Sequence, residues 1–323
     1  MKRAFITGCG QDASYLAEYL LDINYEVHIL IRRQSSPENQ HSRLDHVKND
    51  NLHFHYGDMT DMSSLMRIMV EVMPDEIYNL AAQSHVRVSF DLPHFTVNTN
   101  AMGVLNILEA YRQICPKAKF YQASSSEMFG NTVDEDGKQR ESTPMTPVSP
   151  YGCSKLFGYS MIRHYRKAYG LHACNGILFN HSSPRRAMNF VIPKVIRGAV
   201  AIKLGKTDKL ELGNLDSSRD FGHAYDYVRG MYRIINHDVA DDFVISTMDT
   251  HTIRDLCKLV FSELDMNYED YIVQNPKYMR PEELNYLCGD STKFRNTFPD
   301  FEFKYSYDAM IKEMVDDAMN KLK

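Results

Sequence analysis

The sequence predicts a doubly wound, parallel α/β sheet with a second, smaller α/β lobe. Apolar strand patterns alternate with helix-periodic segments along most of the chain, and a glycine-rich turn joins the first strand to the first helix. This alternation loosens in two later segments. We therefore expect a sheet domain of residues 1–187 plus about 216–247, and a smaller lobe of about 188–215 plus 248–323.

The first strand–helix junction contains the glycine-rich turn. Residues 3–7 have the pattern of a short buried strand, and helical periodicity begins at Ser14. Gly8 and Gly10 would let the backbone turn tightly and approach a pyrophosphate, whose charge would then lie at a helix N-terminus. Ala13 takes the third position of this fingerprint, which tolerates alanine. The turn predicts dinucleotide binding on a Rossmann fold.

The second strand, residues 27–31, ends at two arginines. An NAD-selective site would have an acid there to bind the ribose 2′-hydroxyl. This chain instead has Arg32 and Arg33, followed by the hydroxyls of Ser35 and Ser36. Because a guanidinium binds phosphate through two parallel hydrogen bonds, the segment favours NADP over NAD. The alternative is that one of the two arginines is solvated on a loop.

Further strands and helices follow in alternation. The strand patterns cover residues 52–58, 76–82, 119–124 and 173–180, and helical patterns cover 62–73 and 98–112. Ligands of such sheets bind outside the carboxyl ends of the strands. Asp58 ends the third strand, where adenine would lie, and small residues at the end of the fourth would let a cofactor lie against the backbone.

Composition excludes several classes of function. The net charge of −5 and the pI near 6.2 give no electrostatic reason to expect a nucleic-acid partner. Six scattered cysteines without a Cys-x-x-Cys pair argue against a zinc site or a disulfide framework, and they suit a reducing compartment. No segment approaches a membrane span or a signal peptide. We expect a cytoplasmic protein without a metal.

Two pairs of polar residues are candidates for catalysis. Tyr151 and Lys155 lie four residues apart on one helical face, where the cation would lower the pKa of the phenol and make it a usable acid or base. Ser125 and Glu127 follow the fifth strand, so the fold would bring them to the same crevice. The alternatives are a packed ring with a solvated lysine, and an ordinary serine turn with a surface acid.

Several longer motifs extend these patterns over essentially the whole chain. They are Thr7-Gly8, Gly10-Gln11-Asp12, Ser14-Tyr15-Leu16, Ala82-Gln83-Ser84-His85-Val86, Gly176-Ile177-Leu178-Phe179-Asn180-His181, Arg219-Asp220-Phe221-Gly222-His223 and Arg280-Pro281-Glu282-Glu283. With Tyr-x-x-x-Lys, the chain resembles the extended short-chain dehydrogenase/reductases, and among them the GDP-mannose 4,6-dehydratase family.

The resemblance implies a role for each matching position. Catalytic residues would be Ser125, Glu127, Tyr151 and Lys155. NADP would contact Gly8, Gly10, Gln11, Asp12, Arg32, Arg33, Ser35, Asp58, Met59, Leu80, Ala82, Ser84, Lys155, His181 and Arg186. GDP-mannose would contact Asn180, Lys194, Arg219, Arg280 and Glu283. A loop from Arg32 to Arg43 would reach the cofactor of a neighbouring subunit in a homotetramer or dimer.

The chain also departs from the family pattern. The glycine turn is one residue shorter, and about two extra residues lie in the acidic stretch 134–137. Ser182 replaces a family Glu, Pro193 an Arg, and Ala187 a Gly. Two other functions are considered: NADPH-dependent reduction of a 4-keto sugar, alone or beside dehydration, and a catalytically silent NADP-binding regulator. A product would feed GDP-fucose or GDP-rhamnose synthesis.

Overall fold

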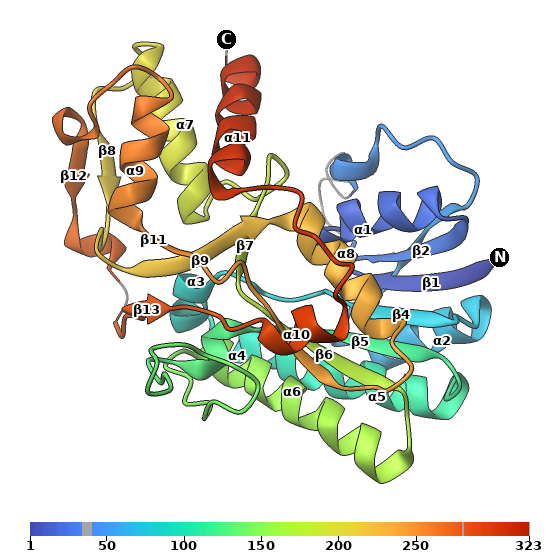
Figure 1. The fold of residues 1–323 in the computed structure, drawn as a ribbon. Helices are drawn as coiled ribbons and strands as arrows, with labels where there is room; N and C mark the ends of the chain where they lie inside the picture. The colour runs from blue at the N-terminus through green and yellow to red at the C-terminus, as the bar shows by residue number, and fades with distance from the viewer. Residues whose placement is uncertain (34–40, 280, 323) are drawn as a thin grey trace.

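A parallel sheet forms the centre of the protein in the computed structural model, which describes residues 1–33, 41–279 and 281–322 (Figure 1). Among these residues the sheet has seven strands in the order β10-β6-β5-β4-β1-β2-β3. Their bounds are β1 Lys2–Thr7, β2 Tyr25–Ile31, β3 Leu52–Tyr56, β4 Glu76–Asn79, β5 Lys119–Ser125, β6 Ala173–Leu178 and β10 Asp242–Ile245. The predicted doubly wound α/β class is confirmed.

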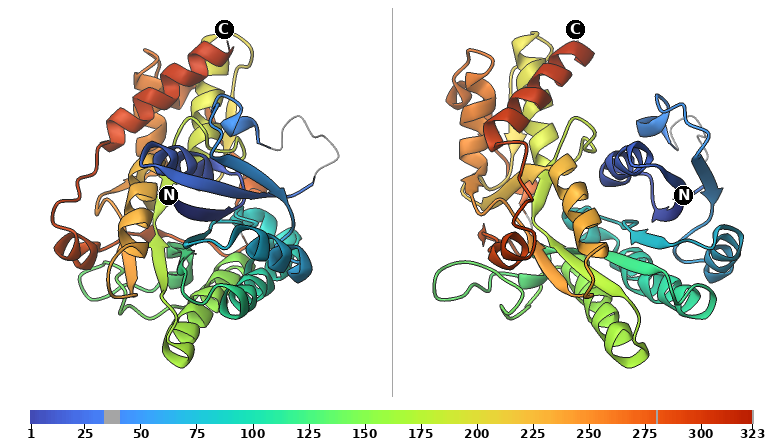
Figure 2. Two further views of the ribbon diagram at one scale, coloured as in Figure 1. Left: turned by 90° about the vertical axis from the view of Figure 1, so that its right-hand side faces the viewer. Right: turned by 45° about the vertical axis from the view of Figure 1, so that its right-hand side comes forward.

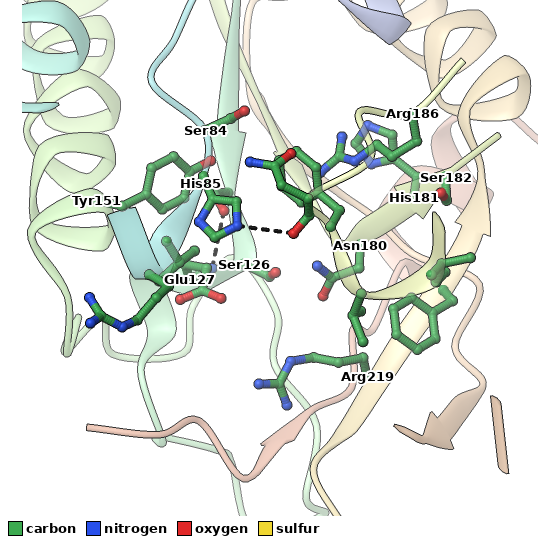
Figure 3. Close-up of a pocket in the computed structure, with 18 of the residues that line it drawn as sticks. Ser84, His85, Ser126, Glu127, Tyr151, Asn180, His181, Ser182, Arg186 and Arg219 are labelled. Atoms are coloured by element: carbon green, nitrogen blue, oxygen red, sulfur yellow. Dashed lines mark hydrogen bonds between the residues drawn. The ribbon is translucent and has the colours of Figure 1, made fainter. Parts of the chain in front are cut away.

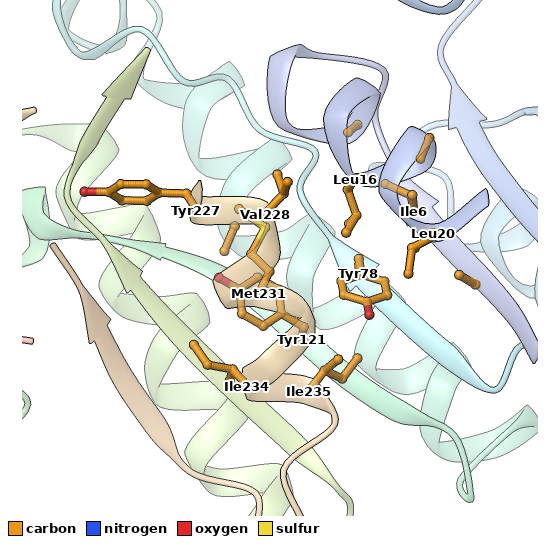
Figure 4. Close-up of a cluster of buried hydrophobic side chains, with 14 of the residues drawn as sticks. Ile6, Leu16, Leu20, Tyr78, Tyr121, Tyr227, Val228, Met231, Ile234 and Ile235 are labelled. Atoms are coloured by element: carbon orange, nitrogen blue, oxygen red, sulfur yellow. The ribbon is translucent and has the colours of Figure 1, made fainter. Parts of the chain in front are cut away.

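Helices cover both faces of this sheet. On one face α1 and α8 pack against the strands through a cluster that includes Leu16, Leu20, Tyr121 and Met231 (Figure 4). On the other face a second cluster joins the strands to α2, α5 and α6. The helix bounds are α1 Gln11–Asp22, α2 Met62–Val72, α3 Val86–Asp91, α4 Pro93–Val97, α5 Gly103–Ile114, α6 Pro150–Tyr169 and α8 Ala224–Ile235. The apolar strand patterns arise because both faces are buried.

The chain leaves the central sheet after Leu178. The sequence predicts one strand over 173–180, and this prediction is wrong at its end, because Asn180–Ser182 forms β7 and pairs with β9 (Ser218–His223). Between the two strands the buried Phe179 packs near Phe129. The chain therefore passes from the central sheet at β6 to a second, smaller sheet at β7.

A smaller group of elements, here named the small lobe, packs around its own apolar cluster. Helices α7, α9 and α11 lie side by side in it (Figures 1 and 2). Helix α11 contributes the buried side chains of Ile311, Met314 and Val315 to this cluster. The remaining bounds are α7 Val191–Lys203, β8 Leu210–Leu212, β11 Thr250–Thr252, α9 Ile253–Ser262, β12 Ile272–Gln274, β13 Tyr286–Leu287, α10 Thr292–Thr297 and α11 Tyr307–Leu322. In the described parts of the chain, no helix is both long and apolar enough to cross a membrane.

Replacing Gly176 in β6 by Ala should destabilise the fold. A Cβ atom there would overlap the Tyr121 hydroxyl and lie 2.7 Å from Cζ of that ring. The ring is fully buried, so it cannot move aside, and overpacking of this kind costs about 1–3 kcal/mol. Urea unfolding should show a lower midpoint. The control is Gly158→Ala in α6, whose Cβ would meet Val104 at an ordinary 3.4 Å; an equal midpoint for the two variants would contradict the account.

Candidate active site

A cavity of about 610 Å³ lies at the carboxyl ends of the central strands, between the sheet and the small lobe (Figure 3). Its position follows the rule for ligands of open parallel sheets. Among the predicted site residues, it is lined by Asp12, Leu80, Ala82, Ser84, Ser125, Glu127, Tyr151, Lys155, Asn180, His181, Arg186, Lys194, Arg219 and Glu283. The structure thus brings together residues predicted for three different roles.

The buried hydroxyl of Thr7 fixes the loop after β4 along one wall. It accepts hydrogen bonds from the backbone N–H groups of Leu80 and Ala81, each at 3.0 Å, and donates one to Asn79 Oδ1 at 2.7 Å. The Asn79 amide in turn donates to Gln122 Oε1 on β5 at 2.7 Å. These bonds hold the ends of β1, β4 and β5 in register at the cavity.

The glycine turn fits a pyrophosphate. Gly8 has a φ of +83°, and a Cβ atom there would lie 3.2 Å from Ala81 Cα, so the close approach of the two loops requires glycine. Gly10 precedes α1, which has no side-chain cap, and nothing lies within 4 Å of the position of its absent Cβ atom. Backbone N–H groups at this helix N-terminus can therefore bind an anion.

Gln11 and Asp12 bond to residues beyond β6. Asp12 Oδ2 lies 3.0 Å from His181 Nε2, and Ser183 donates to Gln11 Oε1 at 2.9 Å. Burial alone would raise the pKa of Asp12, but His181 and Arg186 hold it well below its usual range. These contacts join the glycine turn to β7. Direct contact of Gln11, Asp12, His181 or Arg186 with NADP stays a prediction.

The four predicted catalytic residues come from two neighbouring elements. Ser125 and Glu127 follow β5, where Ser125 Oγ accepts a hydrogen bond from the Glu127 backbone N–H at 3.2 Å. Tyr151 and Lys155 lie in the first turns of α6, and Lys155 Nζ donates to the Ala123 carbonyl at 2.8 Å. All four residues are at least nine-tenths buried. The sequence alternatives of a solvated lysine and a surface acid are therefore wrong.

The sequence predicts a lowered pKa for Tyr151, but the residues of the chain alone raise it. Burial raises the pKa of Tyr151 to about 12, although a hydrogen bond with Ser125 and the charge of Arg186 act in the opposite direction. Lys155 Nζ lies 5.8 Å from the centroid of the phenol ring, and burial lowers its own pKa to about 8. Sequence spacing identifies Tyr151 and Lys155 as a pair. It does not give the free-energy cost of removing their charged forms from water, which shifts both pKa values.

Polar groups from the small lobe and from β9 form the opposite wall. Arg219 is buried, and its Nη2 lies 3.3 Å from Glu283 Oε1. Lys194 Nζ lies 3.5 Å from the ring centroid of Tyr278, and burial lowers its pKa. In the described part of the chain, Asn180 Oδ1 is buried without a hydrogen-bond partner. This wall offers cations for a diphosphate and an aromatic face.

Some lining residues were not predicted from the sequence. His85 accepts a hydrogen bond from the Val88 N–H, and its Nε2 lies 3.1 Å from the Asn189 carbonyl, so it connects two sides of the cavity. Arg87, Lys277 and Tyr278 also line it. His85 belongs to a motif that the sequence contains, and Lys277-Tyr278 closely precedes Arg280, so position along the chain offered a signal for these residues.

Other predicted residues lie away from this cavity or outside the described part of the chain. Arg32 and Arg33 are exposed just after β2, with Arg32 5.9 Å from the Phe95 ring centroid. The Asp58 carboxylate accepts two hydrogen bonds from Thr60, and the Met59 side chain is buried in the core. Ser35 and Arg280 fall outside the described residues.

Comparisons with known proteins identify the family. A family model described as GDP-mannose 4,6 dehydratase matches residues 5–314. The chain is 43% identical to GDP-mannose 4,6 dehydratase 1 of Arabidopsis thaliana, over 100% of this chain and 91% of that one. It is 41% identical to the human GDP-mannose 4,6 dehydratase, over 97% and 90%.

Solved structures share the fold at lower identity. The dTDP-glucose 4,6-dehydratase DesIV of Streptomyces venezuelae, solved with NAD, has a TM-score of 0.86 at 23% identity and covers 98% of this chain and 97% of its own. RMD of Pseudomonas aeruginosa, solved with NADPH, has a TM-score of 0.82 at 23% identity and covers 99% and 100%. The family match over nearly the whole chain confirms the resemblance seen in the motifs: this chain belongs to the GDP-mannose 4,6-dehydratase family.

Proposed function

We propose that this protein removes water from GDP-D-mannose to form GDP-4-keto-6-deoxy-D-mannose, with NADP as a cofactor restored in each turnover. The observation that best supports this reaction is the position of Glu127. Its buried carboxylate lines the same cavity as Ser125 and Tyr151 (Figure 3). It is close enough to the phenol for its charge to raise the pKa of Tyr151. Oxidation or reduction at C4 alone would need no such acid.

The first half of the reaction makes C5 acidic. A hexose C5 proton is not acidic until C4 becomes a ketone, because the carbanion then formed is an enolate. Tyr151 takes the proton of the C4 hydroxyl, and Ser125 donates a hydrogen bond to the C4 oxygen as charge develops. NADP, when bound, supplies the redox chemistry by accepting the hydride from C4 and returning it to C6. Burial keeps the Tyr151 phenol protonated in the chain alone, so a positive charge beside the ring, such as the oxidised nicotinamide would supply, is needed to lower its pKa.

The second half needs Glu127. Its carboxylate removes the C5 proton, and the C6 hydroxyl departs as water. Tyr151 takes up the C4 hydroxyl proton and Glu127 the C5 proton. Of two protons returned to the sugar, one goes to the departing C6 hydroxide, which leaves as water, and one goes to C5. The sugar loses one molecule of water and undergoes no net oxidation.

Residues on the opposite wall would bind the nucleotide diphosphate. Arg219 and Lys194 provide the cations, and the ring of Tyr278 provides a stacking surface. Arg280 remains a predicted contact. On the cofactor side, Arg32 and Arg33 at the end of β2 would bind the 2′-phosphate of NADP.

Product analysis tests the proposed substrate and reaction. Purified protein with NADP should convert GDP-mannose to a 4-keto-6-deoxy sugar that NMR identifies, while UDP-glucose and dTDP-glucose should remain unchanged. Conversion of another sugar nucleotide in preference to GDP-mannose would contradict the assignment. The absence of any conversion would favour the regulator.

Reduction of the product is the second activity considered, and it is not favoured as the principal function. Adding NADPH in excess to the same reaction tests it. We expect the 4-keto sugar to persist. A reduced nucleotide sugar would show that the site also delivers hydride to C4.

Activity should decline as the pH rises through about 8. Burial lowers the pKa of Lys155 from 10.5 to about 8, so the folded protein loses this charge while the unfolded chain still holds it. The free energy of unfolding should therefore rise with pH between about 8 and 10.5, because the cost of burying a charged lysine is relieved. Over the same range the site loses its cation. The measurement is kcat/KM against pH in the free enzyme. A flat profile across pH 8 would contradict the role of the charge.

We further propose a cytoplasmic homotetramer or dimer whose product enters deoxysugar synthesis of the GDP-fucose or GDP-rhamnose kind. The segment 32–43, of which residues 34–40 lie outside the described part of the chain, is predicted to reach a neighbouring subunit's cofactor. At its described end, Arg43 Nε donates to the Arg185 carbonyl at 2.8 Å, next to the predicted cofactor contact Arg186. Light scattering after size exclusion, with and without NADP, measures the assembly. A monomer under both conditions would contradict it.

A further inference from the structure

A cluster of histidines and a glutamate lies at the edge of the central sheet, outside the cavity. Glu26 and His28 alternate along β2 and share one face of the strand, and His53 and His55 do the same on β3. His28 lies directly opposite His53 in the parallel register. Glu26 and His53 lie near the amino ends of their strands and His28 in the middle of β2, whereas the cavity is at the carboxyl ends of the central strands.

Three ligand atoms in this cluster surround a common point. Glu26 Oε1 lies 3.4 Å from His28 Nε2 and 3.3 Å from His53 Nε2. The donor atoms of the three residues are within 4.8 Å of one another. Ligands about 2.0–2.1 Å from a tetrahedral zinc ion are separated by about 3.3–3.4 Å. Two of the three separations already have this value.

His28 is held as a metal ligand would be. Its Nε2 is buried and has no hydrogen-bond partner among the described residues, although Glu26 Oε1 is nearby. Its other ring nitrogen, Nδ1, lies 2.9 Å from His55 Nε2, and His55 Nδ1 lies 3.9 Å from Glu71 Oε2. Metal-binding histidines have such an outer hydrogen bond, which fixes the orientation of the ring.

We propose that Glu26, His28 and His53 bind one zinc ion, which links the edge strand β3 to β2. Two imidazoles and one carboxylate suit zinc, whereas calcium and magnesium prefer oxygen ligands alone. Glu26 and His53 are 30% and 41% exposed, so water can reach the fourth position. The absence of a metal was predicted from the cysteine pattern, which says nothing about histidine and glutamate donors.

Zinc titration of the full chain, free of any affinity tag, tests the site. Calorimetry should show one zinc per chain, and saturating zinc should raise Tm by about 4–6 °C. Magnesium should do neither. Cobalt should give the visible absorption of a four-coordinate ion with nitrogen and oxygen ligands, without thiolate charge-transfer bands.

Two variants locate the ion. Glu26→Gln and His53→Gln change partly exposed side chains, and each should lose at least tenfold in zinc affinity and most of the Tm increase. His164→Gln on α6, an exposed histidine outside this cluster, should keep both. Circular dichroism without zinc checks that the variants fold, and the cobalt spectrum of the unmodified protein provides a test that does not depend on them. No zinc binding, equal binding in all three variants, or a thiolate spectrum would overturn the proposal.

Discussion

Replacing Glu127 by Gln should reduce dehydration by about 10²–10⁴-fold, the contribution typical of a positioned general base. The amide has nearly the same shape as the carboxylate but cannot remove the C5 proton. Oxidation at C4 should survive, because Tyr151 and Lys155 are unchanged. The variant should therefore accumulate reduced cofactor in a single turnover, seen as near-ultraviolet absorbance, without forming the deoxysugar.

The matched control for this change is Glu135→Gln. Glu135 is an exposed acid in the stretch 134–137, so the same loss of charge should leave dehydration unaffected. Dehydration at the normal rate in Glu127→Gln would contradict the assignment of the C5 base. Loss of C4 oxidation as well would show that Glu127 acts earlier than proposed.

Replacing Tyr151 by Phe should abolish both halves of the reaction, with a loss of about 10³-fold or more. The ring would still fill its buried position in α6, but nothing would take the C4 hydroxyl proton. No reduced cofactor should appear in a single turnover, which distinguishes this variant from Glu127→Gln. Binding of GDP-mannose, measured by calorimetry, should change little.

Tyr169→Phe is the control for the loss of a phenol on the same helix. Tyr169 is 49% exposed at the other end of α6, so its hydroxyl should have no effect on turnover. C4 oxidation that persists in Tyr151→Phe would contradict the role given to this phenol. It would mean that another group receives the proton.

Much of the sheet could be predicted because its strands are local apolar runs separated by turn and helix signals. The glycine turn at Gly8 and Gly10 has a local cause too, since backbone conformation and close approach restrict the residue type. Tyr151 and Lys155 were found because helical spacing is local. Each of these features is determined by residues near one another in the sequence.

Other features depend on contacts between distant segments. The chain changes sheets at Phe179 because β9, some forty residues later, pairs with Asn180–Ser182, and no pattern within 173–182 shows this. The raised pKa of Tyr151 depends on its burial by residues from several distant segments. The cluster of Glu26, His28 and His53 could not be predicted from the sequence. Its residues come from two separate strands, and only the β2–β3 register places His28 opposite His53.

The central claim is that hydride moves within one sugar, from C4 to C6. Incubating the protein and NADP with GDP-mannose that carries deuterium at C4, and locating the label in the product by NMR, tests it most directly. We predict one deuterium at C6 of a 4-keto-6-deoxy sugar, with solvent hydrogen at C5. A product without deuterium at C6, or deuterium retained at C4, would contradict the account.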